Sequence, residues 1–311
     1  MTAARGFTKL DPMENRATRQ PKVPGSLNLW RPERQSLPLV LASPHSGAEY
    51  PEDLLAASRL DPLTLRRSED SFVDEIVAAA PELGAPLLAA RFPRAYLDVN
   101  REAWELDPTM FADPLPSYAN TRSPRVRMGL GTIARVVASG EEIYARKLRF
   151  LEAKQRVEEL YQPYHQALRR LVGETEAMFG GCLLIDCHSM PSTASEGGGR
   201  DAADVVLGDC HGAACTARIL EAARGFLANR KFSVALNAPY AGGFTTGHYG
   251  NPRRGRHALQ IEINRGLYMD ERSYQRNAGF DRLRAVMTAL VEHLGEVMQE
   301  LLVEPPRAAA E

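Results

Sequence analysis

Two histidines that each follow a short apolar run are the first candidates for chemistry. His45 comes after the run 37–42 and His188 comes after the run 182–187, each within a short polar turn. Ligands of open α/β sheets bind outside the carboxyl ends of the strands, so both side chains are expected at one edge of a sheet. Neutral imidazole is a common zinc ligand, and a catalytic zinc takes three protein ligands. The pair therefore predicts a metal site whose third protein ligand has still to be identified.

The missing ligand is expected to be a carboxylate, and three acidic residues are candidates. Glu49 follows His45 by four residues, while Glu69 and Asp70 stand at the start of an expected helix over 69–83. An acidic residue in the first turn of a helix is also favoured by the helix dipole alone. The spacing of the residues leaves the choice among the three open.

Two further segments are read as strands with one polar face. Residues 258–264 alternate strictly and put Glu262 on the polar face. A strand inside a parallel sheet is normally apolar on both faces, so this face meets either solvent at a sheet edge or a site. In the second case Glu262 is a general base beside a metal-bound water. Residues 95–100 show the same alternation, and the flanking Arg94 and Arg101 would suit a small anionic substrate or would form exposed salt bridges.

A glycine-dense segment between aromatic residues, 240–250, is expected to be a functional loop. Gly242 and Gly243 permit positive φ and a close approach of the backbone to a ligand. The sequence has neither G-x-G-x-x-G after a strand nor G-x4-G-K-[ST], which argues against nucleotide binding. It also lacks G-x-S-x-G, which disfavours a serine hydrolase.

Strands that alternate with helices predict an α/β architecture with a mainly parallel sheet. Residues 1–35 show no periodicity and are expected to form a flexible arm before a single domain over 36–311. Strands are expected at 37–42, 86–92, 95–100, 182–187, 204–208, 232–236 and 258–264, and helices at 69–83, 141–179 with a break at Pro163, 213–228 and 273–302.

Composition limits the function classes. The 311 residues carry 38 Lys and Arg against 39 Asp and Glu, so no global charge favours nucleic acid or an anionic membrane. The polar N-terminus and the absence of a long apolar run predict a cytoplasmic protein without a membrane span. Four cysteines are too few for a disulfide framework and are expected to be reduced.

Taken together and in order, these motifs strongly resemble the N-formylglutamate amidohydrolase family. The resemblance covers about residues 38 to 275. The segments that carry it are 43–47, 69–74, 94–101, 186–190 and 260–268, with further matches at 127–131, 143–144, 163–165, 206–209 and 240–243.

The resemblance implies a three-layer fold like that of the zinc carboxypeptidases and aspartoacylases, with a mixed, mostly parallel sheet between helices. It implies zinc-dependent hydrolysis of N-formyl-L-glutamate to formate and L-glutamate, as in histidine degradation. Position 48 is alanine, so the carboxypeptidase pattern His-x-x-Glu is absent, and Asp70 is favoured because it begins Asp-x-x-Val-Asp. The matching positions are His45, Asp70 and His188 for the metal, Glu262 and Arg94 for catalysis, and Asn100, Arg101, Gly242, Gly243 and Arg265 for the substrate.

Other functions fit the same motifs. The chain could act on another N-acyl or N-formyl amino acid, or could be a binding protein that keeps the fold without turnover.

Two further histidines are not assigned to the site by these motifs. His165 is expected to be structural, and His248, in the glycine-dense loop, is a candidate to close over the substrate.

Overall fold

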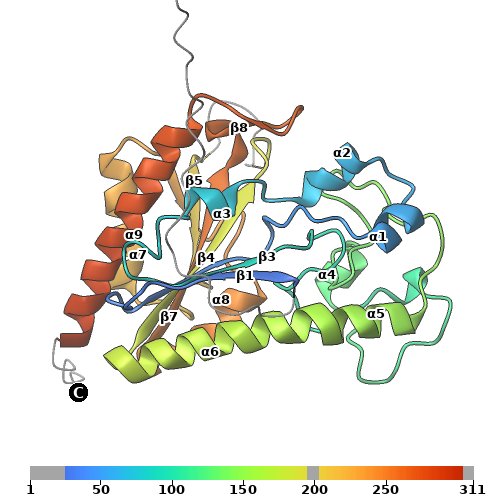
Figure 1. Cartoon of the computed structure of the whole chain (residues 1–311), viewed down its shortest axis with the longest axis horizontal. Coiled ribbons are helices and arrows are strands. Elements are labelled where there is room, and N and C mark those ends of the chain that lie inside the picture. Colours follow the sequence, from blue (N-terminus) through green and yellow to red (C-terminus); the bar gives the residue numbers. More distant parts are fainter. Residues whose placement is uncertain (1–24, 195–202, 304–311) are drawn as a thin grey trace, which may run out of the picture.

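Apolar runs that end in polar turns build the central sheet of the protein. The computed structural model describes residues 25–194 and 203–303, and in it seven strands form one sheet in the order β1-β3-β2-β4-β7-β5-β6 (Figure 1). Neighbouring strands run parallel except in the pairs β1–β3 and β7–β5. The strands are β1 (Leu27–Trp30), β2 (Leu39–Ser43), β3 (Leu87–Ala90), β4 (Cys182–Met190), β5 (Val205–Gly208), β6 (Val234–Leu236) and β7 (Arg256–Asn264), and a separate hairpin pairs β8 (Met269–Asp270) with β9 (Gln275–Arg276).

Helices cover both faces of this sheet and give three layers. Helix α6 covers one face, and α7 and α9 cover the other (Figure 1). The helices are α1 (Glu52–Ala57), α2 (Pro62–Leu65), α3 (Val73–Ile76), α4 (Pro124–Arg127), α5 (Phe150–Arg156), α6 (Gln162–Phe179), α7 (Ala217–Asn229), α8 (Phe244–Tyr249) and α9 (Phe280–Val303), with a π-helical turn at Val157–Tyr161. The expected three-layer architecture with a mixed, mostly parallel sheet is confirmed.

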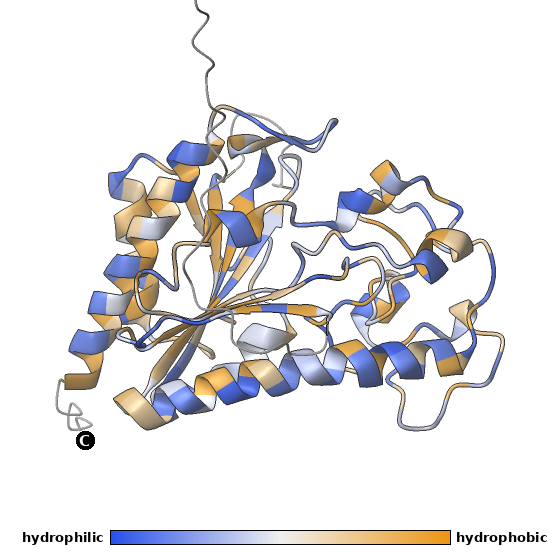
Figure 2. Ribbon diagram, viewed as in Figure 1, coloured by the Kyte–Doolittle hydropathy of each residue, from blue (hydrophilic) through white to orange (hydrophobic). Residues whose placement is uncertain are grey.

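Alternate residues of each central strand enter different cores. In β4, Leu184 packs in the core beneath α6, whereas Leu183 and Ile185 pack in the core beneath α7 and α9. This is the two-residue period of a strand, and apolar residues on both faces suit a covered, parallel strand. Figure 2 shows the hydrophobic residues along the strands and both hydrophobic and hydrophilic residues on α6 and α9. A polar residue in β4 therefore lies on the α6 side or on the side of α7 and α9 according to its place in this alternation.

The long helical signal over 141–179 corresponds to two helices joined without a gap. Helix α5 continues through the π-helical turn into α6, and Pro163 lies in the first turn of α6. A proline has no N–H to donate, so the π-helical turn just before it accommodates the lost hydrogen bond. Gly180 ends α6 with a left-handed φ of 84°, which glycine adopts without a steric cost.

Residues 95–100 do not form the expected strand. They form turns, in which the Asn100 amide donates to Asp98 Oδ1 at 2.8 Å and the Asp98 amide donates to the Thr132 carbonyl. A short carboxylate side chain that accepts from the backbone two residues on competes with strand pairing. The alternation of polar residues here was therefore not a sign of strand structure.

Three other boundaries differ from expectation. The helix expected over 69–83 is reduced to α3. Phe72 has a left-handed φ of 67°, so a helix that began at residue 69 could not continue through it. The last helix begins at Phe280, since the β8–β9 hairpin takes up the residues before it. The N-terminal arm was expected over 1–35, but β1 lies within this range and pairs with β3 in the sheet. Residues 1–24 lie outside the described part of the chain.

Two expectations about the chain as a whole can be compared with the structure. All four cysteines are free thiols, as expected. Within residues 25–194 and 203–303, no helix has the length and apolar character that crossing a membrane requires.

Candidate active site

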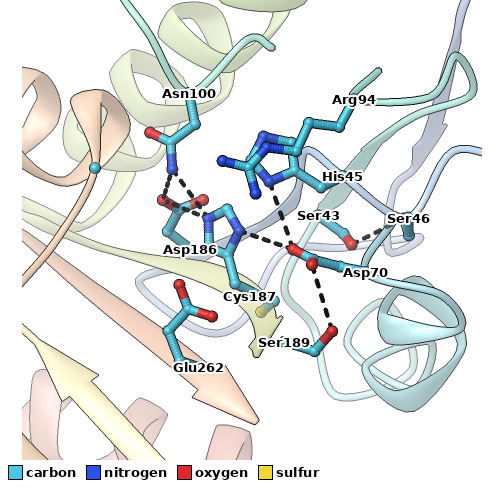
Figure 3. A network of polar contacts seen from close by, with 12 residues as sticks. Ser43, His45, Ser46, Asp70, Arg94, Asn100, Asp186, Cys187, Ser189 and Glu262 are labelled. Carbon is cyan, nitrogen blue, oxygen red and sulfur yellow. Dashed lines mark hydrogen bonds and ion pairs between the residues drawn. The ribbon is translucent and has the colours of Figure 1, made fainter. Parts of the chain in front are cut away.

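The candidate active site lies at the carboxyl ends of β2, β4 and β7, on the sheet face that α6 and α8 cover. His188 in β4 pairs in register with Glu262 in β7, so the two side chains leave the same face side by side. His45 lies two residues after β2, and its carbonyl accepts a hydrogen bond from the Asp70 amide. Figure 3 shows His45 and Asp70 facing each other, with Glu262 close to them. Four segments that are far apart in sequence therefore meet here.

Two imidazoles and one carboxylate have the arrangement of a metal site. Asp70 Oδ2 lies 3.1 Å from His188 Nδ1 and 3.5 Å from His45 Nδ1. One ligand atom from each of the three residues lies within 4.8 Å of the others, and all three residues are buried. His45 Nδ1 has no hydrogen-bond partner among the described residues. A buried nitrogen without a partner, next to a second imidazole and a carboxylate, fits a bound divalent cation such as zinc.

Each histidine is held from behind by a second carboxylate. Asp98 Oδ1 lies 2.8 Å from His45 Nε2, and Asp186 Oδ2 lies 3.0 Å from His188 Nε2. Carboxylates in this position orient the rings, and here they leave Nδ1 of both histidines on the side of Asp70. The second Nε2 contact extends to Asn100, whose Nδ2 donates to Asp186 at 3.4 Å. The histidines are thus oriented in advance for ligation through Nδ1.

Two buried carboxylates of the cluster, those of Asp70 and Asp98, stay ionised because neighbouring side chains stabilise their negative charge. Burial alone would raise the pKa of Asp70, but the nearby imidazoles of His188 and His45 outweigh it and hold the pKa well below its usual value. Burial likewise opposes ionisation of Asp98, but the charges of Arg101 and Arg94 keep the pKa of this carboxyl well below its usual value. Both carboxylates are therefore ionised at neutral pH.

Removal of the charge of Asp186 should weaken metal binding. The substitution Asp186→Asn keeps the size of the side chain but lowers the basicity of His188, and loss of such a partner costs roughly 10–100-fold in metal affinity or activity. Competition for zinc against a chromophoric chelator measures this affinity. An affinity equal to that of the unchanged protein would show that Asp186 does not support a metal ligand.

Glu262 is a buried carboxylate that faces the cluster without joining it. It is 7% exposed, and burial raises its pKa to about 7. Gln260, two residues earlier on the same face of β7, donates from Nε2 to Glu262 Oε1 at 2.9 Å. Gln260 in turn accepts the Gly243 amide at 2.7 Å, which ties the base to the glycine-dense loop. A carboxylate with a pKa near neutrality can both accept and return a proton.

The arginines at the site differ in what holds them. Arg94 donates from Nε to Asp98 Oδ2 at 2.9 Å and keeps 27% of its side chain exposed. Arg101 donates to the carbonyls of Leu130 and Asn100 at 2.9 and 2.7 Å. Arg265 donates to Asp70 Oδ1 at 3.0 Å. The structure therefore gives Arg265 a direct contact with a candidate metal ligand.

The other two candidates for the third ligand point elsewhere. Glu49 is exposed and pairs with Arg91 at 2.7 Å. Glu69 is buried, but its carboxylate accepts hydrogen bonds from Arg66 and Tyr50. Asp70 is the acidic residue that the structure brings to both histidines.

One cavity of about 660 Å³ contains the whole predicted site. A volume in this range is typical of a small-molecule site. The ten predicted residues all line it: His45, Asp70, Arg94, Asn100, Arg101, His188, Gly242, Gly243, Glu262 and Arg265. A Cβ at position 243 would clash with the side chain of Asn100, so only glycine fits there.

Four residues at the site were not predicted to have roles. Asp186 and Gln260 stand two residues before His188 and Glu262, so the strand period alone could have placed them on the same face. The contact of Asp98 with His45 was missed because residues 95–100 were predicted to form a strand. Arg125, which also lines the cavity, comes from an irregular segment and carries no such signal.

The two ambiguous histidines lie outside the cavity. His165 is buried in α6, with Nε2 2.8 Å from the Val99 carbonyl and Nδ1 3.0 Å from Tyr249 Oη, which confirms a structural histidine. His248 is exposed on α8 and stacks on Phe244, with ring centroids 4.8 Å apart. Nothing in this position of His248 suggests closure over a substrate.

His165 should make the stability of the protein depend on pH. Burial lowers the pKa of His165 to about 4, below the value near 6.5 of an unfolded chain. The unfolded state therefore binds the proton first, and the stabilisation present above pH 6.5 is lost as the pH falls toward 4. At pH 5 the expected loss is roughly 2 kcal/mol. Urea unfolding of the wild type and of His165→Gln at pH 7 and 5 measures it, and equal pH effects in both proteins would contradict it.

Comparison with known proteins decides the family. The family model described as N-formylglutamate amidohydrolase matches residues 37–269. The chain belongs to the N-formylglutamate amidohydrolase family. The match includes every residue of the candidate site, and it confirms the resemblance seen in the sequence motifs.

Relatives in this family share most of their length with the chain. A crystal structure of N-formylglutamate amidohydrolase from Ralstonia eutropha JMP134 is 37% identical, with a TM-score of 0.83, over 88% of this chain and 99% of that one. The N-formylglutamate deformylase of Pseudomonas putida is 29% identical over 76% of this chain and 83% of the relative. The N-formylglutamate deformylase of Pseudomonas aeruginosa is 28% identical over 84% of this chain and 94% of the relative.

Proposed function

We propose that the chain hydrolyses the formamide C–N bond of N-formyl-L-glutamate and releases formate and L-glutamate. The observation that carries the proposal is the position of Glu262, a buried base beside the cluster of His45, Asp70 and His188 in an arginine-lined cavity. Amide hydrolysis needs such a base, and the arginines suit an anionic substrate. The names of the relatives, N-formylglutamate amidohydrolase and N-formylglutamate deformylase, support the same reaction.

We further propose that His45, Asp70 and His188 hold one zinc ion. Two imidazoles and a carboxylate are a common ligand set of catalytic zinc, and the unpartnered His45 Nδ1 supports this assignment. A bound zinc ion would supply a Lewis acid that polarises a carbonyl oxygen and makes a water molecule more acidic. The ring orientations set by Asp98 and Asp186 prepare the site for it.

Glu262 moves the proton in this mechanism. It accepts a proton from the attacking water as the C–O bond forms, and it returns that proton to the nitrogen as the C–N bond breaks. Atoms balance, because one water is consumed and its second proton leaves with formic acid, which ionises. The hydrogen bond from Gln260 fixes the carboxylate for both transfers.

The arginines and Asn100 bind and orient the substrate. Arg94, held on Asp98, directs its positive charge toward the oxygen that becomes negative in the transition state. Arg101 and Asn100, which both line the cavity, hold a carboxylate of the substrate. The residues thereby place the formyl carbon between Glu262 and the metal ligands.

A panel of substrates tests the reaction and its specificity. Formate release by the purified, zinc-loaded protein is measured with N-formyl-L-glutamate, N-formyl-L-aspartate and an N-formyl amino acid with an apolar side chain, and release of acetate is measured with N-acetyl-L-glutamate. N-formyl-L-glutamate should give the highest kcat/KM. A higher kcat/KM with another member of the panel would assign a different substrate, and no turnover would favour a binding protein.

The setting of the reaction is also part of the proposal. A cytoplasmic location and a place in histidine degradation are the expectations that the sequence and the family resemblance give. Partners other than a small anionic N-acyl amino acid are not expected, since the charge of the chain is nearly balanced.

A further inference from the structure

Four arginines line the cavity, and they differ in how their guanidinium groups are used. Arg94 and Arg265 are paired with carboxylates, and Arg101 donates to two carbonyls. Arg125 lines the same cavity, yet no hydrogen bond or ion pair engages its guanidinium within residues 25–194 and 203–303. An arginine is always charged and has five donors in a fork that matches a carboxylate. Arg125 is therefore a cation with free donors at the wall of the site.

The backbone of Arg125 is held in place even though its side chain has no such partner. It lies in α4, where Ser123 caps the helix by accepting the Val126 amide at 3.0 Å. The Arg125 carbonyl accepts the Leu130 amide at 2.8 Å, and Val126 is buried. Arg125 is half-buried between these anchors. A side chain on a fixed backbone segment can bind a ligand with a smaller loss of freedom.

Arg125 lies close enough to Arg101 for the two charges to affect each other. Arg101 Nη2 is 3.5 Å from Asp98, which contacts His45. Burial lowers the pKa of Arg101 to about 10 and outweighs the opposing effect of Asp98, while the positive charges of Arg94 and Arg125 add to the lowering. The charge of Arg125 thus acts on Arg101. Two neighbouring cations favour a ligand with more than one negative group.

The wall next to Arg125 is apolar. Met128, Leu130, Ala134 and Val136 line the cavity on this side, and they come from the same segment as Arg125. Methylene groups of a substrate side chain gain from contact with such a surface. The wall therefore combines an apolar stretch with a cation, as a side chain of methylenes and a terminal carboxylate requires.

We propose that Arg125 binds the side-chain carboxylate of the substrate and sets the preference for an acidic N-formyl amino acid. The inference rests on the proposed function, because it assigns one of the two carboxylates of N-formyl-L-glutamate. Arg101 and Asn100, nearer to the metal cluster, then receive the α-carboxylate, which is closer to the formyl group. Arg125 is a specificity-determining residue that takes no part in the proton transfers.

The test compares N-formyl-L-glutamate with N-formyl-L-glutamine, which has the same shape but a neutral side chain. In Arg125→Gln, kcat/KM for the glutamate substrate should fall on the order of 10- to 100-fold, the range for a lost charge-assisted hydrogen bond. For the glutamine substrate it should change less than about threefold. Arg125→Lys keeps the charge but not the fork and should recover part of the loss. The matched control is Arg127→Gln, on the same short helix but exposed and outside the cavity.

The outcomes separate the inference from the proposed function. Equal losses with both substrates, or no loss with the glutamate substrate, would overturn the role of Arg125. If the wild type released no formate, the proposed reaction would be wrong. Calorimetric affinities for the two compounds, measured with zinc-loaded Glu262→Gln and with the same protein carrying Arg125→Gln, would still decide the inference. A selective loss of affinity for N-formyl-L-glutamate supports it, and an unselective loss contradicts it.

Discussion

The substitution Glu262→Gln is expected to lower kcat by about 10² or more while the protein keeps its metal. The amide has the size of the carboxylate and can still contact Gln260, but it cannot accept a proton, and loss of a general base typically costs 10²–10⁴-fold. Formate release under saturating N-formyl-L-glutamate gives kcat, and elemental analysis gives the metal content.

The control for this prediction is a carboxylate outside the cavity. Glu49→Gln removes an exposed carboxylate that pairs with Arg91, and it should leave kcat unchanged. Full activity of Glu262→Gln at equal metal content would remove Glu262 from the mechanism. A loss of activity that follows a loss of metal would instead assign Glu262 to the metal site.

The substitution Asp70→Asn should lower metal affinity by more than the roughly 10–100-fold expected for Asp186→Asn, because Asp70 faces both histidines directly. The neutral amide is a poor zinc ligand, and it leaves the buried Arg265 without its carboxylate partner. kcat/KM at limiting zinc should fall in parallel. Zinc competition and kinetics at several zinc concentrations measure both effects.

Two comparisons make the assignment of Asp70 specific. Glu49→Gln should bind zinc like the unchanged protein, since Glu49 does not reach the cluster. Thermal unfolding of zinc-free Asp70→Asn shows whether the loss of the pair with Arg265 has unfolded the chain. Unchanged zinc affinity in a folded Asp70→Asn protein would refute Asp70 as a ligand.

The order of secondary structure could be predicted wherever apolar periodicity was strong. The runs that became β2 and β4 were recognised because they are continuously apolar and end in polar turns, and β7 was recognised by the strict alternation of its residues. The prediction failed at 95–100, where Asp98 bonds to the backbone instead of joining a strand. It also failed at β1, whose pairing with β3 depends on residues about 60 positions away. Local pattern does not report such long-range contacts.

The candidate site followed the same division. His45, His188 and Glu262 could be placed because they end or alternate along apolar strands, and the structure brings all three to one cavity. The choice of Asp70 over Glu49 came from a family motif, since spacing alone treated both alike. Arg125 was missed because a short helix in an irregular segment has no periodic signal. Its free guanidinium becomes apparent only when the partners of the other arginines are known.

Reversible metal dependence of formate release tests the central claim most directly. Purified protein is assayed with N-formyl-L-glutamate before chelation, after removal of metal by a chelator, and after addition of zinc. The account predicts turnover that is lost with the chelator and restored by zinc, with a return that requires intact His45, Asp70 and His188. Turnover that persists in metal-free protein would contradict the account, since no metal would then be needed for the reaction.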